Sequence, residues 1–459
     1  MPHHQIQTTL SGIQYNLDWP NLPNVEKVDL GCLPMLETMM ENGIWVNRRH
    51  LETVREMAVE QEEGNIAKLE GLVGRRINPE SSQQTASLLY DELGFHKLLP
   101  KLPPKTDSGK QFTTDDGTLS AMRCQFLEIG LPDCYDVVEC VVQARQANTI
   151  RTMFCEPLIE ISKQSRDGRI RPRFKYTMAK TGRLACEKPN LQNISVRSEL
   201  GKGVRRAFAA NGEYWGGGRE STTLVSCDYS QIEMRMAAHM SGDPNIAAVF
   251  WGGLDIHTMT AAAIFRIPPE QVTKLQRLVC KTLGFAILYG VTPDGLQEQI
   301  FAAGGPFWTL AQCEELIKGW FAHYRGIWEW VMLQQSRTRQ YGCNWDFVGR
   351  PKLVPEAHST IERVRDRGFR ECGNFPLQAG AQAIIKIAMG ELWPVIEDYR
   401  RRGVCEPLLQ VHDELIFEVE REMAGDFAEE CRAAIAGVVN LDVPVDTSCD
   451  VGVKWGDLK

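Results

Sequence analysis

Two acidic segments of this 459-residue chain carry the residue types and spacing best suited to chemistry. They span residues 225–235 and 408–417, and in each a hydrophobic, strand-like run delivers an aspartate to its end, Asp228 in the first and Asp413 in the second. A carboxylate at the end of a buried strand has to be neutralised. Two such strands side by side would present both aspartates to a pair of divalent cations, the arrangement used for in-line displacement at phosphorus. Either aspartate alone could instead be a turn residue or a helix N-cap.

A third segment, residues 276–290, places Arg277, Lys281, Phe285 and Tyr289 four residues apart. On a helix such residues share one face. Two cations and two aromatic rings would then form a single stripe. Cations suit a triphosphate and flat rings suit a base. The alternative is an amphipathic helix with a solvated basic end and two aromatic core residues.

Taken in order, these segments resemble the polymerase-I-type (family A) DNA polymerases. The run from Asp228 to Arg235 resembles the first palm motif, the stripe resembles the mobile fingers helix, and His412-Asp413-Glu414 resembles the second palm motif. Three further blocks resemble the family. Thr181–Leu184 with Pro189–Ile194 is similar to the primer–template segment, and Asp255–Thr258 is similar to the segment ahead of the fingers helix. Arg370-x3-Asn374-x3-Gln378 is similar to the helix near the templating base. The resemblance covers essentially the whole chain, most strongly from about residue 170, and the run after Gln378 has a phage-like flavour.

The resemblance implies an α+β right-hand fold, with an antiparallel palm sheet and helical fingers and thumb. The expected divisions are a lead-in (1–25), a thumb (26–165), a palm in two parts (166–242 and 396–459) and fingers (243–395). The implied activity is template-directed DNA synthesis, in which a dNMP is added to a primer 3′-hydroxyl and pyrophosphate is released. A single-subunit RNA polymerase and an inactive DNA-binding relative are the alternatives. Gly284, where the family often has asparagine, costs up to ~1 kcal/mol inside a helix and would loosen closure of the fingers.

The resemblance also implies roles for individual residues. Asp228 and Asp413 would hold two Mg²⁺ ions, for which Mn²⁺ can substitute, with the Tyr229 carbonyl as a third ligand. Lys281 and Glu414 complete the implied catalytic set. The nucleotide would be bound by Gln231, Glu233, His257, Arg277, Lys281, Phe285 and Tyr289, with Glu233 and Tyr289 forming a gate that excludes the 2′-hydroxyl of ribose. Primer–template DNA would be contacted by Arg183, Asn190, Gln192, Asn193, Arg370, Asn374, Gln378, Gln410 and His412.

Composition is compatible with this interpretation. The net charge of −8 is an average, whereas DNA binding needs only a local basic stripe. Candidate stripes are a basic loop at residues 97–117 and two arginine-rich runs. The first run contains Arg197, Lys202, Arg205 and Arg206, and the second contains Arg363, Arg365, Arg367 and Arg370. The alternative is that these charges belong to solvated helix faces. The fourteen cysteines show no metal-binding spacing and are expected to be reduced thiols. With no signal core and no apolar run of about twenty residues, a monomer in the cytoplasm of a bacterial or phage-infected cell is expected.

The elements that must position these residues follow from periodicity and turn signals. Residues 28–72 are expected to be helical with a break at 41–47, residues 174–228 to alternate strands and loops with a hairpin tip at 215–218, and residues 243–395 to be mostly helical. Strands are expected around Asp413, followed by a final helix near residues 423–439. About 25 residues precede the first helix, so no intrinsic 3′-5′ or 5′ nuclease is expected, and a separate nuclease or processivity factor is a candidate partner.

Overall fold

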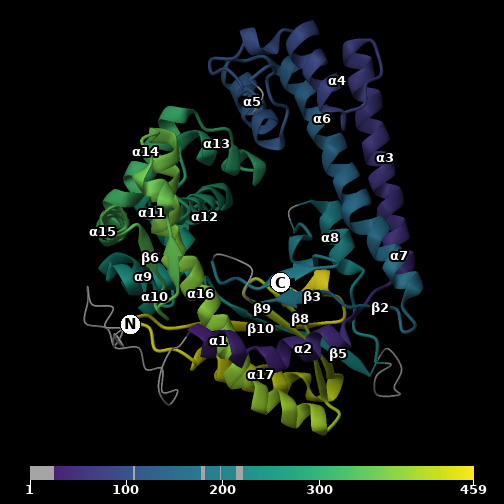
Figure 1. Ribbon diagram of the computed structural model, residues 1–459, viewed down its shortest axis with the longest axis vertical. Helices are drawn as coiled ribbons and strands as arrows, with labels where there is room; N and C mark the ends of the chain where they lie inside the picture. Colours follow the sequence, from purple (N-terminus) through teal and green to yellow (C-terminus); the bar gives the residue numbers. More distant parts are fainter. Residues whose placement is uncertain (1–24, 107–108, 177–180, 197, 213–220, 459) are drawn as a thin grey trace.

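The protein has the α+β right-hand arrangement expected from its sequence. The computed structural model describes residues 25–106, 109–176, 181–196, 198–212 and 221–458. A β-sheet lies at the base of the molecule, a long pair of helices rises on one side, and a second helical lobe rises on the other (Figure 1). The predicted lead-in and the predicted hairpin tip at 215–218 lie outside the described residues.

The central sheet has four antiparallel strands in the order β10-β5-β9-β8. They are β5 (Thr222–Tyr229), β8 (Cys405–Val411), β9 (Glu414–Glu420) and β10 (Thr447–Gly452). Strand β5 lies between two neighbours and is buried along nearly its whole length, which accounts for its continuous apolar run. Strands β8 and β9 form a hairpin whose turn is His412-Asp413. Strand β10 was not expected from the sequence; it is half-buried at the sheet edge and lacks an alternating pattern.

Helices cover this sheet and tie it to the rest of the chain. Helix α17 (Ala424–Ala436) packs against β5 and β10, confirming the predicted final helix, and α16 (Glu362–Arg401) runs for 40 residues past β8. Helices α1 (Val25–Gly31) and α2 (Leu33–Asn42) pack against α16, and α2 also packs against β8. The sequence places these two helices at the start of the predicted thumb, yet they lie beneath the sheet (Figure 1).

The long helical pair consists of α3 (Arg48–Val73) and α6 (Pro132–Thr149), which pack closely together. The predicted break ahead of α3 is confirmed, because Gly43 ends α2 with a φ of 62° and the Asn47 side chain caps α3 by accepting from the backbone N–H of His50. A separate apolar core fills the tip of this pair. Around it lie α4 (Ser82–Ala86), η1 (Ser87–Glu92), η2 (Phe95–Lys97) and α5 (Asp116–Glu128). The continuation of α6, η3 (Ile150–Cys155) and α7 (Glu156–Gln164), packs instead into the main core. The described part of the predicted loop at 97–117 joins η2 to α5.

The second lobe is mostly helical, as predicted for residues 243–395. Its helices are α10 (Pro244–Trp251), α11 (Ile256–Phe265), α12 (Lys274–Leu288), α13 (Pro293–Ala302), α14 (Leu310–His323) and α15 (Arg325–Tyr341), with a hairpin of β6 (Cys343–Trp345) and β7 (Pro351–Leu353). Helix α12 begins with a capping box between Thr273 and Gln276. A Cβ at Gly284 would lie 3.7 Å from the Met234 Cε, an ordinary packing distance, so this position has room for a methyl group and packing does not require glycine there.

Several shorter elements lie outside the central sheet and the long helical pair. They are β1 (Ile44–Trp45), β2 (Arg169–Ile170), β3 (Arg173–Lys175), β4 (Ala185–Glu187), η4 (Leu191–Asn193), α8 (Glu199–Arg206) and α9 (Ile232–Ser241). Helix α8 lies where strands and loops were expected. Its basic residues already have partners within the protein: Lys202 pairs with Glu199, Arg206 pairs with Asp457, and Arg205 lies over the Trp455 ring. This run is therefore less available for DNA phosphates than the sequence suggests.

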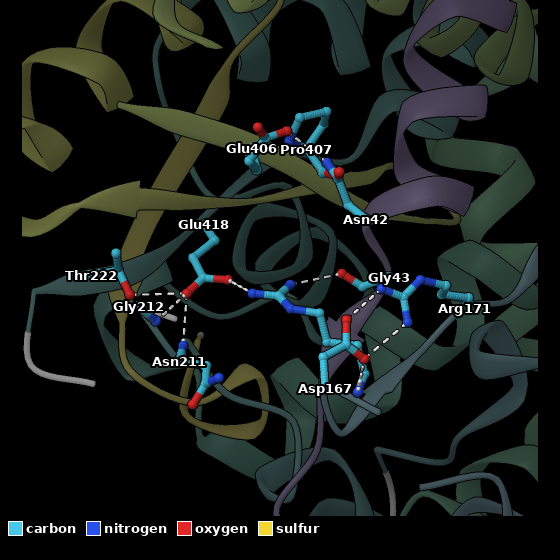
Figure 2. Close-up of polar contacts among 11 residues, drawn as sticks. Asn42, Gly43, Asp167, Arg171, Asn211, Gly212, Thr222, Glu406, Pro407 and Glu418 are labelled. Atoms are coloured by element: carbon cyan, nitrogen blue, oxygen red, sulfur yellow. Dashed lines mark hydrogen bonds and ion pairs between the residues drawn. The ribbon is translucent and has the colours of Figure 1, made fainter. Parts of the chain in front are cut away.

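A buried ion pair joins the sheet to the segment that follows the helical pair. The Arg169 guanidinium donates to Glu418 Oε2 at 2.7 Å, and both side chains are at most 1% exposed. The other Glu418 oxygen accepts from the Asn211 and Gly212 backbone N–H groups and from the Thr222 hydroxyl (Figure 2). Arg169 also donates to the Gly43 carbonyl. One carboxylate thus connects β9, β5, β2 and the loop that contains Asn211 and Gly212.

We predict that Glu418→Gln destabilises the protein by about 3–5 kcal/mol, because it leaves the buried Arg169 charge without its partner. The free energy of unfolding, measured by urea denaturation, tests this. Asp457→Asn is the control: it breaks the exposed Arg206–Asp457 pair and should cost no more than about 1 kcal/mol. Equal losses in the two variants would contradict the prediction.

Candidate active site

The two predicted catalytic aspartates lie at one edge of the sheet. Asp228 is near the end of β5 and pairs across the sheet with Glu414, the first residue of β9. Asp413 immediately precedes that residue in the β8–β9 turn, and its carbonyl accepts from the Tyr229 backbone N–H at 3.4 Å. The strand pairing therefore brings together two acidic residues that are 185 positions apart in the sequence (413 − 228).

The donor set around these aspartates fits Mg²⁺. Burial raises the pKa of the Tyr229 phenol, whose hydroxyl donates to the Ile435 carbonyl at 2.6 Å, so the backbone carbonyl of Tyr229 is its candidate ligand. Glu414 is 3% exposed and accepts from the Ser226 hydroxyl at 2.5 Å. Among the described residues no group of three or more His, Cys, Asp or Glu side chains could hold a metal ion by itself. Two carboxylates and a carbonyl suit a hard cation that completes its octahedron with water and substrate phosphates.

Three predicted residues from separate segments converge next to the acidic pair. Glu233, in the first turn of α9, accepts from the Tyr289 hydroxyl at 3.0 and 3.1 Å and from Arg183 Nη2 at 2.9 Å. Arg183 Nη2 also lies 3.4 Å from the Tyr289 hydroxyl. Burial acts to lower the pKa of Arg183, but its neighbours Tyr289, Glu233 and Asp413 outweigh it and raise that pKa. We call Arg183, Glu233 and Tyr289 the gate cluster.

The predicted stripe on the 276–290 helix is confirmed as a helical face. Helix α12 contains Arg277, Lys281 and Phe285, and Tyr289 caps its C-terminus. The rings of Phe285 and His257 are 5.7 Å apart, so α11 brings His257 to the same face. The tyrosine end of this stripe reaches the gate cluster.

His257 is a neutral imidazole in this environment. It is 3% exposed, and burial lowers its pKa to about 4, with Arg277 and Lys281 acting in the same direction against Asp255. It can therefore donate a hydrogen bond near neutral pH but carries no charge there.

Asp255 is a site residue whose role the sequence did not reveal. Its carboxylate accepts from Arg277 Nε and Nη2 at 2.9 and 2.7 Å, and it caps α11 by accepting from the Thr258 backbone N–H at 2.7 Å. The contacts with Arg277 and Thr258 hold the pKa of Asp255 well below its usual range despite partial burial. An N-cap signal was visible in the sequence, but its ion pair with α12 depends on how two helices pack.

Several predicted DNA-contacting residues form a chain of hydrogen bonds that ends on the β8–β9 turn, His412-Asp413. Gln192 Nε2 donates to Gln410 Oε1 at 2.9 Å, and the Gln410 amide donates to the His412 carbonyl. Gln382 donates to the same carbonyl at 3.4 Å, a contact that sequence reasoning missed. His412 has a φ of 58° and a pKa lowered by burial and by Arg183 and Arg205. The hydrogen bonds from Gln410 and Gln382 fix the backbone of the turn that contains Asp413.

Among the other predicted residues, Asn190 and Asn193 are exposed, whereas Gln231 and Asn374 each carry a buried polar atom. Asn190 caps η4 by accepting from the Gln192 backbone N–H, and Asn193 lines a cavity of about 690 Å³ together with Gln143, Gln146 and Ser195. The amide oxygens of Gln231 and Asn374 are buried and lack a hydrogen-bond partner among the described residues. A buried polar atom of this kind suits a ligand.

The α16 residues of the predicted set approach the end of α12. Gly290 has a φ of 68°, and a Cβ there would lie 2.9 Å from Arg370 Cγ, so the arginine side chain packs directly on the residue after Tyr289. Asn374 and Gln378 follow at intervals of about one helical turn. The structure thus places this motif beside the tyrosine end of the stripe.

A four-stranded antiparallel sheet with a carboxylate pair at one edge, flanked by two helical lobes, defines a right-hand polymerase domain. Residues 48–457 match the model of the family described as DNA polymerase family A. This chain belongs to that family, whose members are generally metal-dependent.

Known relatives agree in sequence and in fold. The thermostable DNA polymerase I of Thermus aquaticus is 34% identical over 394 residues, which are 85% of this chain and 43% of that protein. DNA polymerase I of Mycobacterium tuberculosis is 30% identical over 432 residues, 94% of this chain and 44% of that protein. The polymerase domain of Pol1 from M. smegmatis, solved in complex with DNA primer-template and dNTP, superposes with a TM-score of 0.80 at 30% identity and covers 93% of this chain and 70% of that one. The chain spans less than half the length of these two polymerase I relatives.

We predict that His257 makes the ligand-free protein less stable in acid. Its pKa is about 4 in the folded protein and about 6.5 in the unfolded chain. Between about pH 4 and pH 6.5 the unfolded chain therefore binds more protons than the folded protein. The free energy of unfolding falls as the pH drops through this range, by up to about 3 kcal/mol. His257→Gln should remove this part of the pH dependence. Urea denaturation of both proteins from pH 4 to pH 7 measures it, with His358→Gln as an exposed control. Parallel stability curves for wild type and His257→Gln would rule the assignment out.

Proposed function

We propose that this chain carries out template-directed DNA synthesis, adding a dNMP to a primer 3′-hydroxyl and releasing pyrophosphate. The observation that carries the proposal is that the gate cluster lies beside Asp228 and Asp413. A site that can distinguish deoxyribose from ribose is therefore next to a site that can hold metal ions. The relatives named DNA polymerase I and the similar structure containing primer-template and dNTP support the same substrates.

Asp228 and Asp413 would hold two Mg²⁺ ions, for which Mn²⁺ can substitute, with the Tyr229 carbonyl as a third ligand. Bound metal would lower the pKa of the primer hydroxyl and neutralise the phosphates. Glu414 would act on the site through its position next to Asp413, because its own carboxylate is engaged by Ser226.

The α12 stripe would bind the incoming nucleotide. Arg277 and Lys281 would meet the triphosphate as charges, and His257 would meet it as a neutral hydrogen-bond donor because of its low pKa. Lys281 would also donate a proton to the departing pyrophosphate. Phe285 and Tyr289 would form the platform for base and sugar, and Gln231 would offer its buried amide oxygen to the nucleotide.

The gate cluster would exclude ribonucleotides. The Glu233 carboxylate is held by Tyr289 and Arg183, so it cannot move away from a 2′-hydroxyl without breaking these bonds. The 2′-hydroxyl of a ribonucleotide would clash with the Glu233 carboxylate, which is already engaged. It would also lose its hydrogen bonds to water without gaining new ones, so ribonucleotides would bind less well. This geometry favours a DNA polymerase over the alternative of a single-subunit RNA polymerase.

The remaining predicted residues would contact primer–template DNA; they are Arg183, Asn190, Gln192, Asn193, Arg370, Asn374, Gln378, Gln410 and His412. Minor-groove acceptors occur in every correct base pair, so contacts there check shape and not sequence. In this proposal residues 26–165 form the thumb, 166–242 and 396–459 the palm, and 243–395 the fingers. We assign no nuclease to the matched residues, and a separate nuclease or processivity factor could act with a monomer of this chain in the cytoplasm.

We predict that Asp228→Asn or Asp413→Asn reduces primer extension to background and leaves primer–template affinity within about tenfold, since duplex affinity comes mainly from phosphate contacts elsewhere. Extension of a labelled primer with Mg²⁺ and dNTPs measures activity, and fluorescence anisotropy measures binding. Asp457→Asn should behave like wild type in both assays. Normal extension by either catalytic-site variant would disprove the assignment.

We predict that Glu233→Ala raises the rNTP-to-dNTP ratio of kcat/KM by at least about tenfold, because both the clash and the engaged carboxylate are removed. Single-nucleotide incorporation with matched dNTP and rNTP measures the ratio. Glu187→Ala, which removes a surface carboxylate paired with Lys175, is the control. An unchanged ratio in Glu233→Ala would show that another residue forms the gate.

A further inference from the structure

A buried charge cluster that contains none of the predicted site residues joins three distant segments of the chain. Asp29 of α1 accepts from Arg350 at 2.7 and 3.1 Å and from Lys386 Nζ at 2.6 Å. Arg350 lies just before β7, and Lys386 is in the middle of α16. Lys386 is 0% exposed and Asp29 is 6% exposed. A buried lysine is retained as a charge only with a close partner, so Asp29 is the counter-ion that Lys386 and Arg350 share.

Both cations held by Asp29 also contact the segment that leads to Arg183. The Lys386 ammonium donates to the Tyr176 carbonyl at 3.0 Å. The Arg350 guanidinium lies under Gly182, where an added Cβ would be 2.7 Å from Nε and 3.1 Å from Cζ. Gly182 has a φ of 71°, so this position tolerates the close approach and the conformation only because it is glycine. The next residue is Arg183, which donates to Glu233 in the gate cluster.

Asp29 binds the two terminal nitrogens of Arg350, and a second carboxylate lies beside the Nε atom. Asp346 Oδ2 lies 3.7 Å from Arg350 Nε, and both of these atoms are buried and lack a hydrogen-bond partner among the described residues. Burial raises the pKa of Asp346 to about 6, while Arg350 opposes that rise. Loss of Asp29 would remove both hydrogen bonds that hold the terminal nitrogens of Arg350 and would leave Asp346, which makes no hydrogen bond to the guanidinium, as its carboxylate neighbour.

We propose that Asp29 is a positioning residue for the gate: by fixing Arg350 under Gly182 and Lys386 on Tyr176, it holds Arg183 against Glu233 and Tyr289. The inference rests on the function proposed above for the gate cluster. It assigns a part in sugar discrimination to a residue of the first described helix, which the sequence presents only as an acidic residue near the N-terminus.

The test is a double-mutant cycle on single-nucleotide incorporation, using the full chain with primer–template, Mg²⁺, and matched dNTP or rNTP. The proteins are wild type, Asp29→Asn, Arg183→Ala and the double variant. We expect Asp29→Asn to lower kcat/KM for dNTP about tenfold through misplacement of Arg183, and to raise the rNTP-to-dNTP ratio. The double variant should match Arg183→Ala within about twofold, because both changes act through one residue.

Two further variants separate positioning from general stability. Glu139→Gln removes the carboxylate of another part-buried pair, Arg123–Glu139, which joins α5 to α6; it should lower the melting temperature without changing the sugar ratio. If Asp29→Asn does not fold, Lys386→Met replaces it in the cycle, since it removes the contact with Tyr176 and keeps an apolar stem of similar length.

The outcomes distinguish the two proposals. Additive effects of Asp29→Asn and Arg183→Ala, or an Asp29→Asn protein with wild-type sugar ratio, would overturn the positioning role while leaving the proposed function intact. If Arg183→Ala itself has wild-type incorporation and discrimination, the role proposed for Arg183 fails, and the inference fails with it.

Discussion

The pairing of β5 with β9 is the constraint on which the rest of the site depends. It sets Asp228 opposite Glu414 and therefore beside Asp413, which occupies the turn before that residue. A slip of one residue would turn every side chain of β5 to the opposite face. The buried Glu418 carboxylate opposes such a slip, because it binds Thr222 on β5, Arg169, and two backbone N–H groups at the same time. Carboxylates at one end of β9 thus form the site, and a carboxylate near the other end fixes its register.

The gate cluster brings together three segments that are far apart in the sequence. Arg183 comes from the segment after β3, Glu233 from the helix that follows β5, and Tyr289 from the end of α12. Helix α16 packs on the residue after Tyr289 through Arg370 and pairs with Asp29 through Lys386. The same helix therefore contacts both the end of α12 and the charge cluster of Asp29, Arg350 and Lys386.

Local patterns predicted much of this structure, whereas contacts between distant segments escaped prediction. The four-residue spacing of Arg277, Lys281, Phe285 and Tyr289 identified α12, and the apolar runs ahead of Asp228 and Asp413 identified β5 and β8. These two strands were expected side by side, but β9 lies between them. Strand β10 was missed because it is a half-buried edge strand without alternation. The charges of α8 were expected to meet DNA, but Asp457 and Trp455 engage two of them from the far end of the chain. No local pattern marks Asp29, since both of its partners lie more than 300 residues away.

That separation has a consequence for synthesis on the ribosome. Lys386 follows Asp29 by 357 positions, so at about 5–20 residues per second helix α1 waits roughly 20–70 s for its second cation. Strand β5 ends at Tyr229 and its neighbour β10 begins at Thr447, 218 positions later (447 − 229), so β5 waits roughly 10–45 s for this neighbour at the same rate. The charge cluster can form once residue 386 has emerged, whereas the sheet is complete only once residues 447–452 have emerged. A nascent chain of this protein therefore exposes at least one unpaired side of β5 between these two points, and this is the interval in which a chaperone would matter most.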